Sequence, residues 1–222
     1  MQSTGLDRAH FNMIQQQVRP WSVTDGKVLS VLGEVPREAF VPGAYHGLAY
    51  ADIEVPIGDG ETMLAPKVVG RMLQELKIKT DDRILEIGAG TGYVTACLCH
   101  LGGRVVAMEI DPQLADEARA NLSTLGLRRV EVRAGDALAG PVEGNPFDVI
   151  AVTGSLPDDE PVAALQEQLA LGGRLFVVLG EPPVMEATLV TRVRSEDYRR
   201  ETIFETSVQP LKNVPQPVHF VF

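Results

Sequence analysis

Cysteine, aromatic residues and long apolar runs are all scarce in this chain of 222 residues. Its two cysteines, Cys97 and Cys99, lie in a stretch that we expect to be helical. Side chains two positions apart on a helix point to different sides, which argues against both a mutual disulfide and a shared metal. No apolar run approaches the ~20 residues that span a bilayer, and residues 1–17 lack the pattern of a secretion signal. These absences predict a cytoplasmic protein with reduced cysteines and no membrane association.

Positive charge is also in deficit, with 20 lysines and arginines against 30 aspartates and glutamates, for a formal net charge of -10. Such a chain repels a phosphate backbone, so we expect no general nucleic-acid binding. The four histidines, His10, His46, His100 and His219, show no spacing typical of a metal site, and no metal is predicted. Hydrophobic residues make up 45% of the chain, which is enough for a core of its own.

Strand and helix patterns alternate after residue 67 and predict a doubly wound α/β sheet. The strands are short and almost continuously apolar, as in I-L-E-I and V-I-A-V, which is typical of a parallel sheet covered on both faces. We expect strands at 83–87, 105–109, 130–134, 147–153, 174–179, 188–194 and 203–208, the sheet ending in an antiparallel strand. We expect the intervening helices at 67–76, 93–101, 112–125 and 162–169.

The first 66 residues form an N-terminal extension of the same domain, 1–222, in this interpretation. Helices are predicted at 7–18 and 25–33, followed by a helical turn near Pro36. Phe11, Ile14 and Val18 recur at spacings of three and four, so we expect them to form the buried face of the first helix.

A glycine-rich loop follows the strand at 83–87, in the sequence R-I-L-E-I-G-A-G-T-G. Gly88, Gly90 and Gly92 let the backbone turn sharply and let a ligand approach without striking a Cβ. Their G-x-G-x-G spacing differs from the G-x-G-x-x-G of dinucleotide sites. Because Glu86 precedes the loop, we expect a ligand that carries a cation rather than a pyrophosphate.

Two further acidic positions follow the next two predicted strands. Glu109 ends one strand and can accept hydrogen bonds from ribose hydroxyls. Asp136, within Gly135-Asp136-Ala137, can accept from an exocyclic adenine amine, while a nearby backbone N–H serves a ring nitrogen. Open α/β sheets bind ligands at this edge, so the spacing indicates a nucleoside pocket. The alternative is a related fold in which these acids only cap strand ends.

These three elements together resemble the class I S-adenosylmethionine-dependent methyltransferases. The resemblance rests on E-I-G-A-G-T-G, on Glu109 and on Gly135-Asp136. It implies S-adenosyl-L-methionine as cofactor and S-adenosyl-L-homocysteine as product. It also implies that Glu86 contacts the methionine portion through water or the amino group, and that Glu86, Gly88, Gly90, Gly92, Glu109, Asp136 and Ala137 form the cofactor site.

Further segments are similar to the protein-L-isoaspartate O-methyltransferase family over about residues 35–211. They are V-P-R-E-A-F-V-P, A-Y-A-D, P-I-G-D-G-E-T, D-D-R-I-L-E-I-G-A-G-T-G-Y and L-A-L-G-G-R-L. The resemblance implies a Rossmann-like fold and a role in protein repair. It also implies that the enzyme methylates the free α-carboxylate of isoaspartyl residues in protein or peptide substrates. It also implies that Thr153 and Gly154 border the reacting methyl group and that residues 207–211 lie beside the substrate groove.

The substrate loop departs from this family's usual G-Q-T-I-S-Q-P, because residues 60–66 are G-E-T-M-L-A-P. Glu61 and Leu64 replace a glutamine and the serine that engages the reacting carboxylate, while Met63 stands between the retained Thr62 and Leu64. We expect Thr62 to line the acceptor pocket as the catalytic hydroxyl. Lys67 either supplies positive charge to a substrate carboxylate or is a solvated lysine of the first helical turn. Trp21 either packs at a helix end or covers the pocket.

Three hypotheses therefore remain open at this point. The first is isoaspartyl methylation, and the second is methylation of a different acceptor, favoured by Leu64. The third is a catalytically silent module that binds the cofactor. The oligomeric state is not predicted by any of these patterns.

Overall fold

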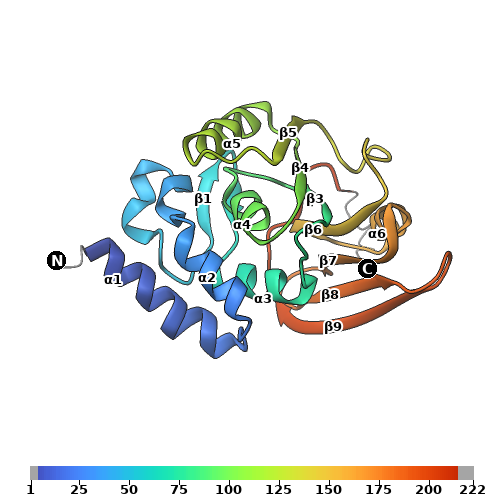
Figure 1. The fold of residues 1–222 in the computed structure, drawn as a ribbon, viewed down its shortest axis with the longest axis horizontal. Helices are drawn as coiled ribbons and strands as arrows, with labels where there is room; N and C mark the ends of the chain where they lie inside the picture. Colours follow the sequence, from blue (N-terminus) through green and yellow to red (C-terminus); the bar gives the residue numbers. More distant parts are fainter. Residues whose placement is uncertain (1–4, 215–222) are drawn as a thin grey trace, which may run out of the picture.

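The computed structural model describes residues 5–214 and is built around a seven-stranded sheet flanked by helices (Figure 1). The strand order is β5-β4-β3-β6-β7-β8-β9, and neighbours are parallel up to β7. The strands are β3 (Arg83–Ile87), β4 (Arg104–Glu109), β5 (Val130–Ala134), β6 (Phe147–Leu156), β7 (Leu169–Leu179), β8 (Met185–Arg192) and β9 (Tyr198–Thr206). The predicted doubly wound sheet is confirmed, with two antiparallel strands at its end where one was expected.

Successive residues of the central strands belong to different cores on the two faces of the sheet. Ile84 packs into one core and Leu85 into the other, and both are fully buried. The helices α3 (Pro66–Leu76), α4 (Tyr93–Leu101) and α5 (Pro112–Thr124) contribute to the first core, and α6 (Glu160–Glu167) to the second. This double coverage is why the strands lack the alternation of a half-exposed sheet.

Strand β7 begins five residues earlier than predicted. A bulge separates its first part from the rest, and only the part after the bulge was predicted as a strand. Phe147 pairs with Leu169 and Val149 with Arg174, so the intervening residues of β7 are extra. Gly172 lies in this bulge with φ at +77°. The glycine pair that suggested a turn before the strand instead permits the irregularity within it.

The N-terminal helices pack on the face that carries α3 and α4. They are α1 (Gly5–Asn12) and α2 (Gly26–Glu34), joined by η1 (Met13–Val18) and η2 (Arg19–Trp21) and followed by η3 (Arg37–Phe40) and η4 (Gly43–Leu48). The prediction that Phe11 is buried is wrong, since it is 61% exposed, whereas Met13 is fully buried. Phe11 belongs to α1, in which no side chain is buried, whereas Met13 and Val18 belong to the π-helical η1 that follows and packs on α3.

A short hairpin that the sequence analysis did not predict carries the substrate loop. It pairs β1 (Val55–Gly58) with β2 (Glu61–Met63) in an antiparallel manner. Its turn holds Asp59 at φ +48° and Gly60 at φ +81°. Three or four residues per strand, one of them proline, give too weak a pattern for detection in the sequence.

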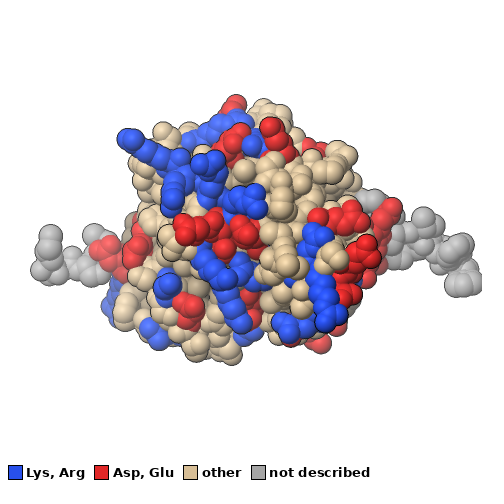
Figure 2. Space-filling model, turned by 45° about the vertical axis from the view of Figure 1, so that its right-hand side comes forward, with Lys and Arg blue, Asp and Glu red and all other residues tan. Residues whose placement is uncertain are grey.

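The surface carries charges of both signs in alternating groups. On the face in Figure 2, a band of acidic side chains lies between two groups of basic ones. Ion pairs of this kind include Arg83 with Asp148 and Arg133 with Glu131. Among residues 5–214, no helix combines the length and apolar character needed to cross a bilayer.

Candidate active site

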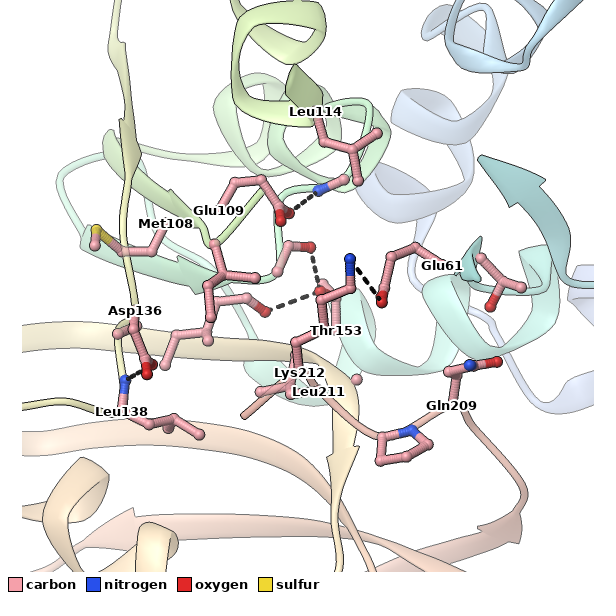
Figure 3. Close-up of a pocket in the computed structure, with 18 of the residues that line it drawn as sticks. Glu61, Met108, Glu109, Leu114, Asp136, Leu138, Thr153, Gln209, Leu211 and Lys212 are labelled. Atoms are coloured by element: carbon pink, nitrogen blue, oxygen red, sulfur yellow. Dashed lines mark hydrogen bonds and ion pairs between the residues drawn. The ribbon is translucent and has the colours of Figure 1, made fainter. Parts of the chain in front are cut away.

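The main cavity lies at the carboxyl ends of β3 and β6, where the winding of the sheet reverses direction. Gly88 follows β3 and lies against Thr153 of β6, whose side chain is labelled in Figure 3. The Thr153 hydroxyl donates to the carbonyl oxygen of Ile87 at 2.9 Å, which joins the two strand ends. Such switch points are where open α/β sheets bind ligands.

The first two glycines of the loop keep the cavity open. At Gly88, with φ +89°, an added Cβ would lie 2.6 Å from the Thr153 hydroxyl oxygen. Gly90 also lines the cavity at positive φ. Gly92 does not line the cavity; it is the N-cap residue of α4, and a Cβ added there would lie 3.4 Å from Ala118. The third glycine therefore serves helix packing.

Two carboxylates predicted for a nucleoside line the cavity together. Glu109, 5% exposed, accepts the N–H groups of Gly90 at 2.7 Å and Asp111 at 3.0 Å. Asp136 accepts the N–H of Leu138 through Oδ1 at 2.8 Å. These bonds fix both side chains and leave acceptor capacity for a ligand, because each ionised carboxylate offers about four lone-pair sites.

Apolar residues that the sequence analysis did not identify complete the cavity wall beside these acids. They are Met108, Ile110, Leu114 and Leu138, which lie with Ala137 around the ends of β4 and β5. Acidic acceptors beside an apolar slot suit the ribose and the flat base of adenosine. The residues present therefore fit the adenosine part of S-adenosylmethionine.

Glu86 lies behind the glycine loop and outside the cavity wall. It is fully buried on the face of the sheet that α4 covers, and it lines neither this cavity nor the smaller one beside it. Neither carboxyl oxygen has a hydrogen-bond partner within the described chain. Burial raises the pKa of Glu86 to about 8, the charge of Glu109 adds to the rise, and the Thr95 hydroxyl opposes it. The carboxyl group is therefore mainly protonated at neutral pH.

The substrate loop borders both the main cavity and the smaller one beside it. Glu61, Thr62 and Leu64 line the main cavity, and Met63 joins Thr62 and Leu64 around the smaller one. Thr62 donates its hydroxyl proton to Glu54 at 3.2 Å. Burial raises the pKa of the Glu54 carboxyl, an effect that this hydrogen bond opposes. The side chain of Leu64 is almost wholly buried and offers no donor.

Arg37 is a buried cation in the smaller cavity that the sequence analysis did not single out. Its Nε donates to the carbonyl oxygen of Ala49 at 2.8 Å, and Nη2 donates to that of Leu64 at 3.0 Å. The guanidinium also lies over the Tyr93 ring, 4.8 Å from its centre. Burial lowers the pKa of Arg37, and the Tyr93 side chain opposes this. The arginine thus ties the substrate loop to the N-terminal segment.

Of the two interpretations of Lys67, the structure supports a lysine of the first helical turn that lies outside the cavity. Its Nζ lies 2.8 Å from Asp52 Oδ2 and 4.7 Å from the centre of the Trp21 ring. Trp21 in turn meets Phe204 edge to face, and neither Lys67 nor Trp21 lines the two cavities. Of the two interpretations of Trp21, the structure supports packing at a helix end.

The C-terminal segment also lines the main cavity. Gln209, Pro210 and Leu211 line it, and the Leu211 N–H donates to the carbonyl oxygen of Ser155 at 3.0 Å. Lys212, the next residue, also lines the cavity and was not predicted. Within residues 5–214, no group of three acidic, histidine or cysteine side chains is arranged to hold a metal; His219 lies outside them.

Comparisons with known proteins agree with this geometry. The model of the Protein-L-isoaspartate(D-aspartate) O-methyltransferase (PCMT) family matches residues 8–212. A protein-L-isoaspartate O-methyltransferase of Aeropyrum pernix is 41% identical over 91% of this chain and 79% of its own length. One of Methylorubrum populi is 39% identical over 92% of this chain and 95% of its own.

Solved structures share the fold. One protein-L-isoaspartate O-methyltransferase superposes with a TM-score of 0.78 at 24% identity, covering 94% of this chain and 66% of the longer one. Another, from Plasmodium falciparum and solved with S-adenosyl-L-homocysteine, gives 0.79 at 20% identity, over 95% of this chain and 99% of its own. The extent of the family match and the identity to its members show that this chain belongs to the protein-L-isoaspartate O-methyltransferase family.

Proposed function

We propose that this chain transfers the methyl group of S-adenosylmethionine to the free α-carboxylate of isoaspartyl residues in proteins or peptides. The observation that carries the proposal is one cavity whose wall includes both the nucleoside-type carboxylates, Glu109 and Asp136, and the substrate loop at Glu61, Thr62 and Leu64. The named activity of relatives that are about 40% identical over most of the chain supports it.

Glu109 and Asp136 hold the cofactor in this proposal. Glu109 accepts the ribose hydroxyls, while Asp136 and the backbone around Ala137 meet the adenine edge. Gly88 and Gly90 leave room for the methionine portion beside Thr153. Glu86 and Gly92 support the loop from behind, since neither lines the cavity.

The acceptor needs no general base. An α-carboxylate has a reference pKa near ~3.5 and is ionised at neutral pH, so its oxygen can attack directly. When bound, S-adenosylmethionine supplies a sulfonium methyl; a C–O bond forms to it as the C–S bond breaks, and the electron pair passes to sulfur. The protein's part is to hold the acceptor oxygen in line and to exclude water, and Thr62, Leu64 and residues 209–211 form that side of the cavity.

A different acceptor of the same class is the second candidate, and Leu64 favours it. Its buried side chain occupies the place at which the family's usual loop has a serine. Loss of a hydrogen bond to a charged group costs about 1.5 to 3 kcal/mol, or about ten- to a hundredfold in rate if it acts only in the transition state.

Transfer of labelled methyl groups to a flexible isoaspartyl peptide tests the proposal, with the matching aspartyl peptide as control. We expect transfer to the isoaspartyl peptide alone. Cofactor binding, measured by calorimetry, shows whether the protein used is competent. Binding without transfer to either peptide would contradict isoaspartyl methylation and leave the second acceptor or the silent module.

Thr62→Ala and Leu64→Ser examine the two sides of the substrate loop in the same assay. If Thr62 lines the acceptor pocket, its truncation lowers turnover on every accepted peptide. Unchanged turnover would remove Thr62 from the proposed catalytic residues. A gain with Leu64→Ser would place the acceptor carboxylate beside position 64.

The proposal extends to the setting in which the protein acts. Residues 1–222 form a single domain, in which residues 1–66 supply the N-terminal helices and the substrate loop and residues 67–222 the cofactor-binding core. Both parts contribute to one hydrophobic core within the described chain. A cytoplasmic location agrees with Cys97 and Cys99 as free thiols. The formal net charge of -10 supports the absence of general nucleic-acid binding.

A further inference from the structure

The acceptor side of the main cavity has few groups that can meet a carboxylate. Leu64 has no donor, and the proton of Thr62 is directed to Glu54. Glu61 and Glu109 line the same cavity and repel an anion. A carboxylate that enters such a place needs a cation beside it, because an unpaired charge loses its hydration without compensation.

Lys212 is the basic residue that lines this cavity within the described chain. Its backbone is held in place by neighbours on either side of Pro210. Ser155 donates its N–H to Gln209 at 2.9 Å, and Leu211 donates to Ser155. In Figure 3 the Lys212 side chain points from this segment across the cavity toward Glu61.

Three carboxylates surround the Lys212 ammonium at unequal distances. Nζ lies 2.7 Å from Asp59 Oδ2, 3.6 Å from Glu61 Oε1 and 3.8 Å from Asp111 Oδ2. The hydrogen bond to Asp59 raises the pKa of Lys212, so the side chain stays cationic. Only Asp59 is within hydrogen-bond distance, and an ammonium group has three N–H donors. Two donors therefore remain for another anion.

Glu61 is the partner that an incoming carboxylate can replace. Its distance of 3.6 Å from Nζ is too long for a good hydrogen bond. Burial raises the pKa of Glu61 in spite of the nearby lysine. Asp59 holds the ammonium from the exposed turn of the hairpin, so this contact can persist while the acceptor takes the place beside Glu61.

We propose that Lys212 binds the carboxylate of the methyl acceptor, with Asp59 holding the ammonium in place. The inference rests on the proposed function and deepens it by naming a substrate-binding cation. Lys212 then substitutes for the serine that Leu64 replaced. Lys212 and Glu61 carry opposite charges and line the same cavity.

The test compares Lys212→Met, Lys212→Arg, Glu61→Gln and the double variant Lys212→Met/Glu61→Gln. Lys27→Met, which removes an exposed lysine of α2 that lines neither cavity, is the matched control. Two quantities are measured with the isoaspartyl peptide: kcat and KM for methyl transfer, and peptide affinity for the protein loaded with S-adenosylhomocysteine. Calorimetry with S-adenosylhomocysteine alone and thermal unfolding check the cofactor site and the fold.

We expect Lys212→Met to weaken peptide affinity and kcat/KM by about 10- to 100-fold, mainly through KM, with cofactor affinity unchanged. Lys212→Arg should retain most activity, Glu61→Gln should lower KM, and Lys27→Met should change nothing. The double variant should remain as weak as Lys212→Met.

Recovery of wild-type kcat/KM in the double variant would overturn the inference, because Lys212 would then serve only to neutralise Glu61. Unchanged peptide affinity in Lys212→Met, or an equal loss of cofactor affinity, would also overturn it. If the wild type binds the isoaspartyl peptide through Lys212 but transfers no methyl group, the proposed function fails and the inference stands.

Discussion

The buried carboxyl group of Glu86 makes the stability of this protein depend on pH in a particular direction. Its pKa is raised from 4.5 to about 8 in the folded protein, chiefly because burial disfavours the charged form. Between these values the unfolded chain has lost the proton and the folded protein keeps it. The free energy of unfolding therefore falls as pH rises through this window, by about 1.4 kcal/mol for each pH unit and about 5 kcal/mol in all.

Glu86→Gln removes this titration while keeping the size of the side chain. An amide without partners costs about 1 to 3 kcal/mol, so the variant should be the less stable protein near pH 5. The wild type loses about 1.4 kcal/mol for each pH unit above 4.5, so the order should reverse between about pH 5 and pH 7, and the wild type should be the less stable protein at higher pH. Glu86 is buried because its strand, β3, lies inside the sheet, with β4 and β6 on either side (Figure 1).

Urea unfolding of both proteins without cofactor, from about pH 5 to pH 9, measures the difference in stability at each pH. Glu117→Gln, which changes an exposed glutamate of α5, controls for the loss of one negative charge. A difference between wild type and Glu86→Gln that stays constant with pH would refute the reasoning, because it would mean that Glu86 titrates alike in both states.

Two further substitutions test the glycine loop and the buried Arg37 beside the cavity. Gly88→Ala should destabilise the protein and abolish detectable cofactor binding by calorimetry, because its Cβ would meet the Thr153 hydroxyl; Gly126→Ala has a similar positive φ but open space, so it should show only the backbone strain of about 1 to 2 kcal/mol. Equal melting temperatures for the two variants would contradict this steric argument. Arg37→Met should lower the free energy of unfolding by about 2 to 6 kcal/mol, because two carbonyl oxygens, including that of Leu64, lose their donor. A loss below about 1 kcal/mol in urea unfolding would mean that water replaces the guanidinium.

Local sequence was sufficient for the elements around the cofactor. The strand at 83–87 and the helix at 93–101 have the predicted bounds, and Asp111 accepts the N–H of Gln113 as an N-cap. Apolar runs, glycine spacing and capping residues act over a few neighbouring positions, so they can be recognised from the sequence alone. The positions of Glu109 and Asp136 followed because parallel strands end at the same edge of a sheet.

The chain alone determined the sheet, the glycine loop and the two nucleoside carboxylates, and through them the family resemblance. Only the tertiary structure decided which charges reach the cavity. It turned Lys67 toward Asp52, enclosed Glu86 behind the loop and brought Lys212 to within 2.7 Å of Asp59. Lys212 and Asp59 are separated by 153 residues, and such contacts depend on how the whole chain packs rather than on any local pattern.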